Sequence, residues 1–283
     1  MPTPVKVEIL DKLLGTYHDK EYIVSGFKYG FYLEYKGEEA ELISTNTKSA
    51  TSHTHIIEKK IKEESQKRRI MGPFNTPLFQ LSKFSPLSVR AKKETGKYRL
   101  IHNLSYPYDE TSVNYNISHE DSTVKYSTIR DAIKSIQLSS PDASMSKTDI
   151  AEAFRIIPLH PSQYHLTGFT WCGKFFYDKC LPMGASSSCR IFERFSDAIR
   201  YILINTYHVQ HVTKILDDFL FVSSSRDNCQ QYLDSFIKLC TEINIPIAHH
   251  KTVPPTNKLT FLGIELDSSK MTAQLPEEKL EQV

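Results

Sequence analysis

The stretch HVTKILDDFLFVSSS, residues 211–225, places two adjacent carboxylates, Asp217 and Asp218, inside an otherwise apolar run. One interpretation is an amphipathic helix with the aspartates on its solvated face, because the apolar residues follow helical spacing at Val212, Ile215, Leu216, Phe219 and Leu220. The other interpretation is two short strands joined by a turn at the aspartates, which the β-branched and aromatic flanks favour. An Asp-Asp pair also arises often by chance, so the stretch alone leaves both interpretations open.

The segments around this stretch favour the two strands. ASMSKTDIAEAF, residues 143–154, leads a strand-like segment into Asp149, and LTFLGIELD, residues 259–267, predicts a closing strand. Two helices are predicted between them: one over residues 228–243, and one after LPMGASSS, whose serines stand where they would cap a helix with apolar residues at Ile191, Phe195, Ala198, Ile199 and Ile202. The order strand, helix, two strands, helix, strand predicts an α+β fold with a split β-α-β sheet.

In such a sheet, the turn at Asp217 would lie beside the end of the strand that terminates at Asp149. Three carboxylates would then converge, and buried charges of one sign are costly unless cations neutralise them. Oxygen ligands that leave open positions suit Mg²⁺, which prefers a few carboxylates plus substrate phosphates. Two such ions would support a phosphoryl or nucleotidyl transfer, so the sequence predicts a magnesium site for that chemistry.

The composition is that of an ordinary globular protein. The 283 residues are enough to bury a large core, and the net charge of +2 excludes a strongly basic tail but not a local basic groove. The five cysteines include no C-x-x-C pair, which argues against a disulfide framework or a zinc knuckle. We therefore expect reduced thiols in a cytoplasmic or nuclear protein, and the lack of a leader-like or long apolar run predicts no membrane partner.

The first half of the chain contains two further predicted elements before a short helix expected over residues 127–138. Residues 55–69 are charged and free of proline, which predicts a solvated helix. Residues 87–105, LSVRAKKETGKYRLIHNLS, alternate around a Glu-Thr-Gly turn, which predicts a hairpin. This hairpin carries one acid, Glu94, against the basic residues Arg90, Lys92, Lys93, Lys97 and Arg99. A solvated edge hairpin protected by its lysines is the alternative to a functional surface.

SKTDIAEAF, LPMG, ILDDFLFV, HHKT and FLGIELD occur in the order and approximate spacing of the palm motifs of reverse transcriptases. The resemblance covers roughly residues 70–283. Within that family, GKYRLIHNLSYP, AFRIIPLHPSQYHLTGFTWCGKFFYDKCLPMG and LDDFL resemble the enzymes of tyrosine-recombinase retrotransposons, the DIRS type. GFKYGFYLEY and RRIMGPF likewise resemble segments that precede the polymerase domain in those elements.

The resemblance implies the fingers and palm of a right-hand polymerase over residues 70–283, after an N-terminal retroelement-type segment at residues 1–69. The palm would be a ferredoxin-like antiparallel sheet with helices on one face. A thumb helix would begin at LPEEKLEQV, residues 275–283.

The resemblance also assigns roles to residues of the predicted palm. Asp149, Asp217 and Asp218 match the metal-binding triad, with Asp149 and Asp217 favoured as direct ligands. Lys251 matches the lysine that protonates the departing pyrophosphate, although a solvated turn lysine is the alternative. The turn that forms the primer grip matches Leu262 and Gly263.

The expected nucleotide site comprises Lys92, Arg99, Phe154, Met183 and Gly184. Lys92 and Arg99 fall where the family grips the triphosphate, which an arginine can do bidentately. Phe154, five residues after Asp149, falls where the family places an aromatic ring against the sugar 2′ position, and an ordinary core aromatic is the alternative. Two departures, Ile215 for a frequent aromatic residue and Met183 for a glutamine of retroviral enzymes, predict altered template contacts.

The implied function is that of a retrotransposon reverse transcriptase, an RNA-directed DNA polymerase that transfers a nucleotidyl group from a dNTP to a primer 3′ end. The implied cofactor is a pair of Mg²⁺ ions, with Mn²⁺ as an alternative. The implied partners are an RNA or DNA template with its primer, dNTPs, and downstream RNase H and recombinase domains of a parent polyprotein. The rivals are an RNA-dependent RNA polymerase, against which Phe154 argues, and a decayed or domesticated nucleic-acid-binding remnant, against which the intact triad argues.

Overall fold

The computed structural model describes residues 1–92 and 96–277. The chain divides into two compact units, each assembled from segments that lie far apart in the sequence. The first unit comprises Met1–Pro4, Tyr22–Val124 and Phe154–Phe192, and the second comprises Val5–Glu21, Lys125–Ala153 and the chain from Glu193 onward. The boundary expected between residues 69 and 70 therefore falls inside the first unit.

The second unit contains a four-stranded antiparallel sheet in the order β11-β6-β10-β9. Its strands are β6 (Ser144–Asp149), β9 (His211–Ile215), β10 (Asp218–Ser223) and β11 (Val253–Thr256). The connecting helices are α7 (Ser188–Asn205), between β6 and β9, and α8 (Arg226–Glu242), between β10 and β11. Numbered along the chain, the strand order is 4-1-3-2, so the predicted split β-α-β sheet is confirmed.

Residues 211–225 form β9, a turn and β10, so the helical interpretation of this stretch is wrong. Phe219 and Phe221 of β10 pack against Phe236 of α8, with ring centroids 4.7 and 5.8 Å apart. Leu220 and Val222 point to the opposite face and belong to a separate buried cluster. Because β10 is buried on both faces, its apolar residues are continuous rather than alternating, which made strand and helix hard to distinguish.

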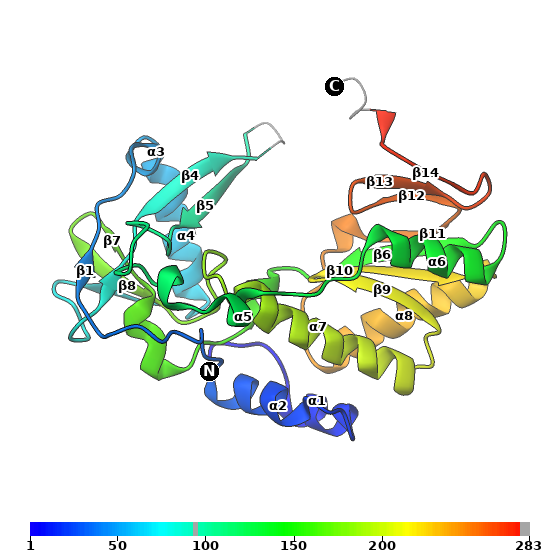
Figure 1. The fold of residues 1–283 in the computed structure, drawn as a ribbon, viewed down its shortest axis with the longest axis horizontal. Helices are drawn as coiled ribbons and strands as arrows, with labels where there is room; N and C mark the ends of the chain where they lie inside the picture. The colour runs from blue at the N-terminus through cyan, green and yellow to red at the C-terminus, as the bar shows by residue number, and fades with distance from the viewer. Residues whose placement is uncertain (93–95, 278–283) are drawn as a thin grey trace. The chain divides into compact units, whose positions relative to one another are not determined.

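The two connecting helices lie on one face of this sheet, as predicted, and a third helix covers the other face (Figure 1). This third helix is α6 (Ile129–Ser139), which matches the helix expected over residues 127–138. Its Ala132 and Ile136 pack with Leu220 and Val222 of β10. The opposite face is therefore a second core and not a solvated surface.

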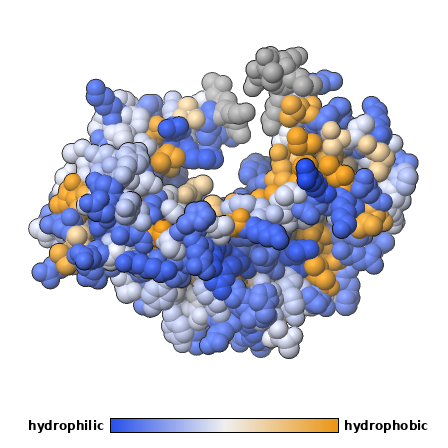
Figure 2. Space-filling model, viewed as in Figure 1, coloured by the Kyte–Doolittle hydropathy of each residue, from blue (hydrophilic) through white to orange (hydrophobic). Residues whose placement is uncertain are grey.

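LTFLGIELD forms a hairpin and not the single closing strand predicted. β12 (Lys258–Phe261) pairs with β13 (Ile264–Asp267), and β14 (Thr272–Gln274) adds a third strand. The turn residues Leu262 and Gly263 have φ angles of 51° and 77°, as a type I′ hairpin turn requires. Apolar residues gather over this small sheet on the visible face of the molecule (Figure 2). Leu262 and Met271, in the turns of this sheet, are exposed.

The first unit contains a five-stranded mixed sheet in the order β1-β3-β7-β8-β2, in which β3 pairs in parallel with β1 and β7. Its strands are β1 (Leu42–Ile43), β2 (Ile70–Phe74), β3 (Lys83–Phe84), β7 (Gly168–Trp171) and β8 (Lys174–Asp178). A separate hairpin of β4 (Leu87–Ala91) and β5 (Tyr98–His102) confirms the hairpin predicted over residues 87–105. The predicted turn residues Glu94 and Thr95 lie outside the described residues.

The predicted helix over residues 55–69 is confirmed as α4 (Thr54–Gln66). Its Ile57 joins a core with Ile70 of β2 and Val89 of β4, which is why residues on both sides of position 70 share one unit. The remaining helices are α1 (Val7–Leu14), α2 (Lys20–Tyr29), α3 (Lys48–Thr51), α5 (His119–Ser122) and the 3₁₀ turns η1 (Asn114–Asn116), η2 (Ala153–Ile156), η3 (Pro161–Leu166) and η4 (His249–Lys251).

Two further findings concern the helices. The serine caps predicted for α7 are wrong for Ser187 and Ser188. The buried Ser187 hydroxyl has no hydrogen-bond partner in the part of the chain that the structure describes, and the Ser188 hydroxyl donates to the Pro182 carbonyl across 2.5 Å. Among the described residues, every helix is too short or too polar to cross a lipid bilayer. The thumb helix expected over residues 275–283 falls mostly outside the described residues.

Candidate active site

The second unit brings the three predicted carboxylates together at one end of its sheet. Asp149 is the last residue of β6 and pairs in register with Asp218, the first residue of β10. Asp217 lies in the β9–β10 turn, where its carbonyl accepts a hydrogen bond from the Ile150 N–H at 3.0 Å. The convergence follows from the antiparallel pairing, because the end of β6 and the start of β10 face each other.

The carboxylates repel one another in a partly desolvated site. Asp149 is 5% exposed. Burial, followed by the charges of Asp217 and Asp149, raises the pKa of Asp218 from 3.8 to about 6. Burial and the charge of Asp149 also raise the pKa of Asp217. The cluster therefore favours a bound cation or a retained proton.

Lys251 supplies one positive charge to this cluster. Its Nζ donates to Asp149 Oδ2 across 2.7 Å, although the lysine side chain is 54% exposed. Burial lowers the pKa of Lys251, but the hydrogen bond and the charge of Asp149 outweigh that effect and the pKa is raised. The backbone fixes the pair, because the Ala248 N–H donates to the Asp149 carbonyl at 2.8 Å and the Lys251 N–H donates to the Ala248 carbonyl at 2.8 Å.

The donor set fits a hard cation that takes part of its coordination from a substrate. Within residues 1–92 and 96–277, His, Cys, Asp and Glu side chains form no cluster of three or more arranged to hold a metal by themselves. Mg²⁺ needs no such protein cage, since one or two carboxylates plus substrate phosphates and water satisfy it. Asp149, Asp217 and Asp218 offer only oxygen atoms as metal ligands. The pKa values of Asp217 and Asp218 are raised because negative charge at this site exceeds positive charge and burial disfavours the ionised form.

The hairpin of the first unit presents a basic face. Arg90 pairs in register with Arg99, and the Lys92 N–H donates to the Lys97 carbonyl at 2.8 Å. Directly opposed residues and residues two apart share one face of a two-stranded ladder, so these four side chains lie together, and all four are exposed. Like charges placed opposite each other destabilise a hairpin unless an anion binds between them. Lys93 lies outside the described residues.

The remaining predicted nucleotide-site residues also lie in the first unit. Phe154 is half-buried in η2, and its ring centroid lies 5.3 Å from that of Phe192. Met183 is 59% exposed. Gly184 admits no side chain, because a Cβ there would collide with the carbonyl of His102 at the end of β5. The loop of Met183 and Gly184 therefore packs against the end of the basic hairpin.

The side chain of Asn114 also binds the backbone of the loop that contains Met183 and Gly184. Its Nδ2 donates to the Gly184 carbonyl at 2.8 Å, and its Oδ1 accepts from the Ser186 N–H at 2.8 Å. In the second unit, the predicted primer-grip residues Leu262 and Gly263 occupy the β12–β13 turn, with Leu262 38% exposed.

Two groups of charged residues escaped the sequence interpretation. In the first unit, Arg155 donates to both carboxylate oxygens of Asp178 at 2.7 and 2.8 Å and to Glu64 at 2.9 Å. In the second unit, the buried Lys214 pairs with Glu193 at 2.7 Å. The sequence held one signal for the Lys214–Glu193 pair. In HVTKI, Lys214 is two residues after Val212 and so shares its inward face, where a charged residue needs a buried partner.

Comparison with known proteins supports this architecture. The reverse transcriptase (RNA-dependent DNA polymerase) family matches residues 91–266, which is more than half of the chain. The genome polyprotein of Petunia vein clearing virus (isolate Shepherd) is 25% identical over 120 residues, which cover 42% of this chain and 5% of the polyprotein.

Among solved structures, the foamy viral protease-reverse transcriptase in complex with RNA/DNA hybrid matches 97% of this chain with a TM-score of 0.68 and 15% identity. The same viral protein, described as dRH and in complex with double-stranded DNA, matches 99% of this chain with a TM-score of 0.65 and 16% identity. This chain covers 37% and 50% of those two chains. The structural likeness shows the fold, and the family match gives the conclusion that this chain belongs to the reverse transcriptase (RNA-dependent DNA polymerase) family.

Proposed function

We propose that this chain is the fingers and palm of an RNA-directed DNA polymerase, which joins the α-phosphate of a dNTP to the 3′ hydroxyl of a primer. One observation carries the proposal: Asp149 and Asp218 are register partners beside the turn that holds Asp217. Three converging carboxylates whose charge Lys251 neutralises only in part are costly for the fold, so the cluster indicates a site built for a cation.

The three aspartates would hold Mg²⁺, with Mn²⁺ as an alternative ion. A pair of such ions, when bound, would lower the pKa of the primer hydroxyl and stabilise charge on the departing pyrophosphate. The chain's own contribution begins with the carboxylates, whose strands orient them before substrate binds. Lys251, already charged beside Asp149, would donate a proton to the leaving pyrophosphate oxygen and recover it from solvent.

The basic face of the β4–β5 hairpin would bind the triphosphate. Arg90, Lys92, Lys97 and Arg99 together present more positive charge than the two residues first assigned to this role. A guanidinium binds phosphate oxygens bidentately, which adds orientation to attraction. Phe154 would exclude ribonucleotides by occupying the space that a 2′ hydroxyl needs.

The biological setting is part of the proposal. The motifs that resemble DIRS-type elements support an origin in a retrotransposon, with residues 1–69 as its N-terminal segment and RNase H and recombinase domains elsewhere in the parent polyprotein. The template with its primer would be RNA or DNA. Reduced cysteines, three of them buried, support action in the cytoplasm or the nucleus.

Primer extension on an RNA template tests this function. Extension should require a divalent ion, should use dNTPs, and should stop at the template position whose complementary dNTP is omitted. Asp217→Asn is the inactive control, since it removes one carboxylate and little volume. Extension with ribonucleotides alone would favour an RNA-dependent RNA polymerase, and tight primer-template binding without any extension would favour a non-catalytic remnant.

A further inference from the structure

We propose that Glu193 and Ser196 of α7 are positioning residues that hold the turn bearing the catalytic aspartates, and that the buried Lys214 orients Glu193 for this task. The proposal rests on the proposed function, because it assigns these residues a role through Asp217 and Asp218. All of the groups involved lie in the second unit.

The backbone of Leu216, the residue before Asp217, is held at both of its polar groups by α7. The Glu193 Oε2 accepts a hydrogen bond from the Leu216 N–H at 2.8 Å. The Ser196 hydroxyl donates to the Leu216 carbonyl at 2.5 Å. The Leu216 N–H belongs to the peptide group before this residue and its carbonyl to the peptide group after it, so α7 holds both peptide groups that flank Leu216. With both groups held, the two side chains fix the entry into the Asp217–Asp218 pair.

The turn needs such support because Leu216 has an unfavourable backbone conformation. Its φ angle is 51°, in the left-handed region that is costly for residues with a branched side chain. Without side-chain partners, the turn would relax toward commoner conformations and move Asp217 away from the end of β6. Strained backbone of this kind persists where surrounding groups over-determine it, and it gathers at functional sites.

Lys214 sets the orientation of the Glu193 carboxylate. The Lys214 side chain is 2% exposed, and its Nζ lies 2.7 Å from Glu193 Oε1 and 2.7 Å from Asp197 Oδ1. One oxygen of Glu193 is therefore bound by the lysine while the other accepts from Leu216. Because breaking this buried pair would leave an uncompensated charge, Glu193 is held in the orientation in which it contacts Lys214.

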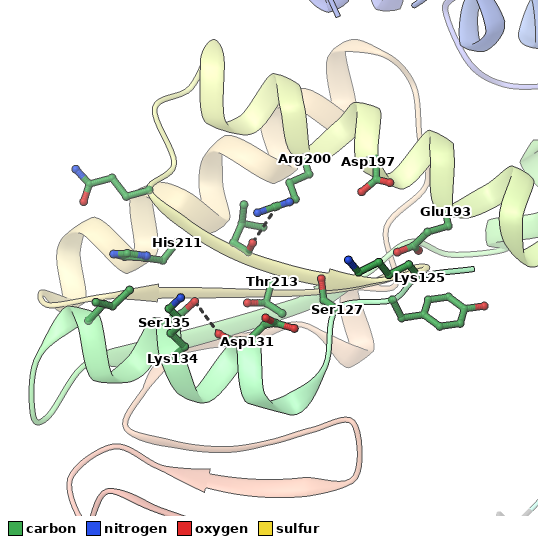
Figure 3. A pocket seen from close by; sticks show the side chains of 14 residues that line it. Lys125, Ser127, Asp131, Lys134, Ser135, Glu193, Asp197, Arg200, His211 and Thr213 are labelled. Carbon is green, nitrogen blue, oxygen red and sulfur yellow. Dashed lines mark hydrogen bonds between the residues drawn. The ribbon is translucent and has the colours of Figure 1, made fainter. Parts of the chain in front are cut away.

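Figure 3 shows Glu193 and Asp197 projecting from α7 toward the sheet, beside a groove of about 420 Å³ at the β9 edge. The groove also exposes Lys125, Lys134 and Arg200, so its charges are mixed and select no ligand class. The two α7 carboxylates that border it are already engaged by Lys214. Asp197 contacts the same lysine as Glu193 without touching Leu216, which makes it a matched control.

The experiment compares Glu193→Ala, Glu193→Gln, Ser196→Ala and Asp197→Asn with the wild type by three measurements. These are Mn²⁺ affinity without substrate by electron paramagnetic resonance, hydrogen exchange at the Leu216 amide by NMR, and kcat for primer extension. Groups that orient metal ligands typically change metal affinity by 10- to 100-fold when removed. Glu193→Ala should weaken Mn²⁺ binding by about tenfold or more and speed Leu216 amide exchange by a similar factor.

The other variants separate positioning from general stability. Glu193→Gln keeps an acceptor for the Leu216 N–H and should stay within about threefold of wild-type Mn²⁺ affinity. Ser196→Ala leaves the buried charges intact and should weaken Mn²⁺ binding by about three- to tenfold, so it tests the proposal even if Glu193→Ala fails to fold. Asp197→Asn keeps an oxygen acceptor for Lys214 and leaves both Leu216 hydrogen bonds intact, so it should change Mn²⁺ affinity and Leu216 exchange less than Ser196→Ala does.

The proposal is overturned if Ser196→Ala retains wild-type Mn²⁺ affinity and wild-type Leu216 amide exchange and any folded Glu193→Ala does the same. It is also overturned if Asp197→Asn weakens Mn²⁺ binding as much as the α7 variants that contact Leu216. If the variants change Mn²⁺ affinity and Leu216 exchange as expected but the wild type extends no primer, the polymerase function is overturned and the positioning role is upheld.

Discussion

The ammonium group of Lys251 donates to Oδ2 of Asp149 across 2.7 Å, although the two residues are 102 positions apart in the chain. The pair places a cation on a carboxylate that β6 presents to β10. Lys251 therefore neutralises part of the charge of the triad and stands within reach of groups that the aspartates would bind.

Replacing Lys251 by alanine should lower kcat for nucleotide addition by about 10²–10⁴-fold, the usual contribution of a positioned proton donor. The KM for dNTP should change less, because the triphosphate contacts are assigned elsewhere. Single-turnover extension measures the chemical step. The matched control is Lys258→Ala, since Lys258 is also 54% exposed and pairs with Glu265 at 2.9 Å. Equal rates for the two variants would exclude Lys251 from the chemistry.

Asp217→Asn should abolish divalent-ion-dependent extension, with a loss of at least about 10³-fold, because the carboxylate that supports transition-state charge is gone. Its free energy of unfolding without metal should not fall, since the amide relieves repulsion from Asp149. Primer extension and urea unfolding in EDTA measure the two quantities. Asp234→Asn on α8, where Asp234 accepts from Gln230 at 2.8 Å, serves as the control. Near wild-type extension by Asp217→Asn would refute the assignment of the triad.

The contribution of Asp218 to the stability of the metal-free protein should decline as the pH rises through its titration. Burial and the neighbouring carboxylates raise the pKa of Asp218 from 3.8 to about 6, so between these values the folded chain binds more protons than the unfolded chain. The contribution of this group to the free energy of unfolding therefore falls with rising pH in this window and levels off above it. Asp218→Asn has no such proton to lose, so in urea unfolding at several pH values the stability of the wild type should fall relative to that of the variant as the pH rises. A difference between the two proteins that does not change with pH would place the titration on another group.

Arg99→Ala should reduce kcat/KM for dNTP by about 2–4 kcal/mol, mainly through a higher KM, if a charged phosphate contact is lost. Primer-template affinity should change little. Steady-state extension and fluorescence anisotropy of a labelled primer-template separate these effects, with Arg226→Ala at the start of α8 as an arginine control in the other unit. Loss of primer-template affinity at constant KM would instead assign the basic hairpin to duplex binding.

Phe154→Ala should admit ribonucleotides, whereas Phe154→Tyr should stay selective for deoxyribonucleotides. A rigid ring that overlaps a 2′ hydroxyl discriminates more strongly than a missing methylene, which is worth about 1–3 kcal/mol. The ratio of kcat/KM for dNTP over rNTP in the wild type and both variants measures the effect. Phe154 also packs near Phe192, so an alanine variant that loses stability but keeps the wild-type ratio would make it an ordinary core residue.

Some errors of the sequence interpretation have a clear physical origin. LTFLGIELD was expected to be one strand, yet it folds back at Leu262 and Gly263. In this turn Leu262 adopts a φ of 51°, which a leucine does not favour and which its identity therefore does not predict. Pairing of β12 with β13 and burial of Leu259, Phe261 and Leu266 stabilise that turn. The local residues carry only one glycine as a signal, so the hairpin could not be separated from a strand.

Local patterns along the chain were enough to predict α4, α6, α7, α8, the β4–β5 hairpin and the strands that carry the three aspartates. They did not predict β11, which takes the place in the sheet that was expected for LTFLGIELD. The sequence also determined that Asp149, Asp217 and Asp218 would meet, because the order of elements dictates which strand ends are adjacent. The pairing of Lys214 with Glu193 and Asp197, and the hydrogen bonds from Glu193 and Ser196 to Leu216, depend on how α7 packs on β9 and its turn and could not be predicted. The physical reason is that periodicity is set by neighbours along the chain, whereas the partner of a buried charge is chosen by long-range packing, which local sequence does not encode.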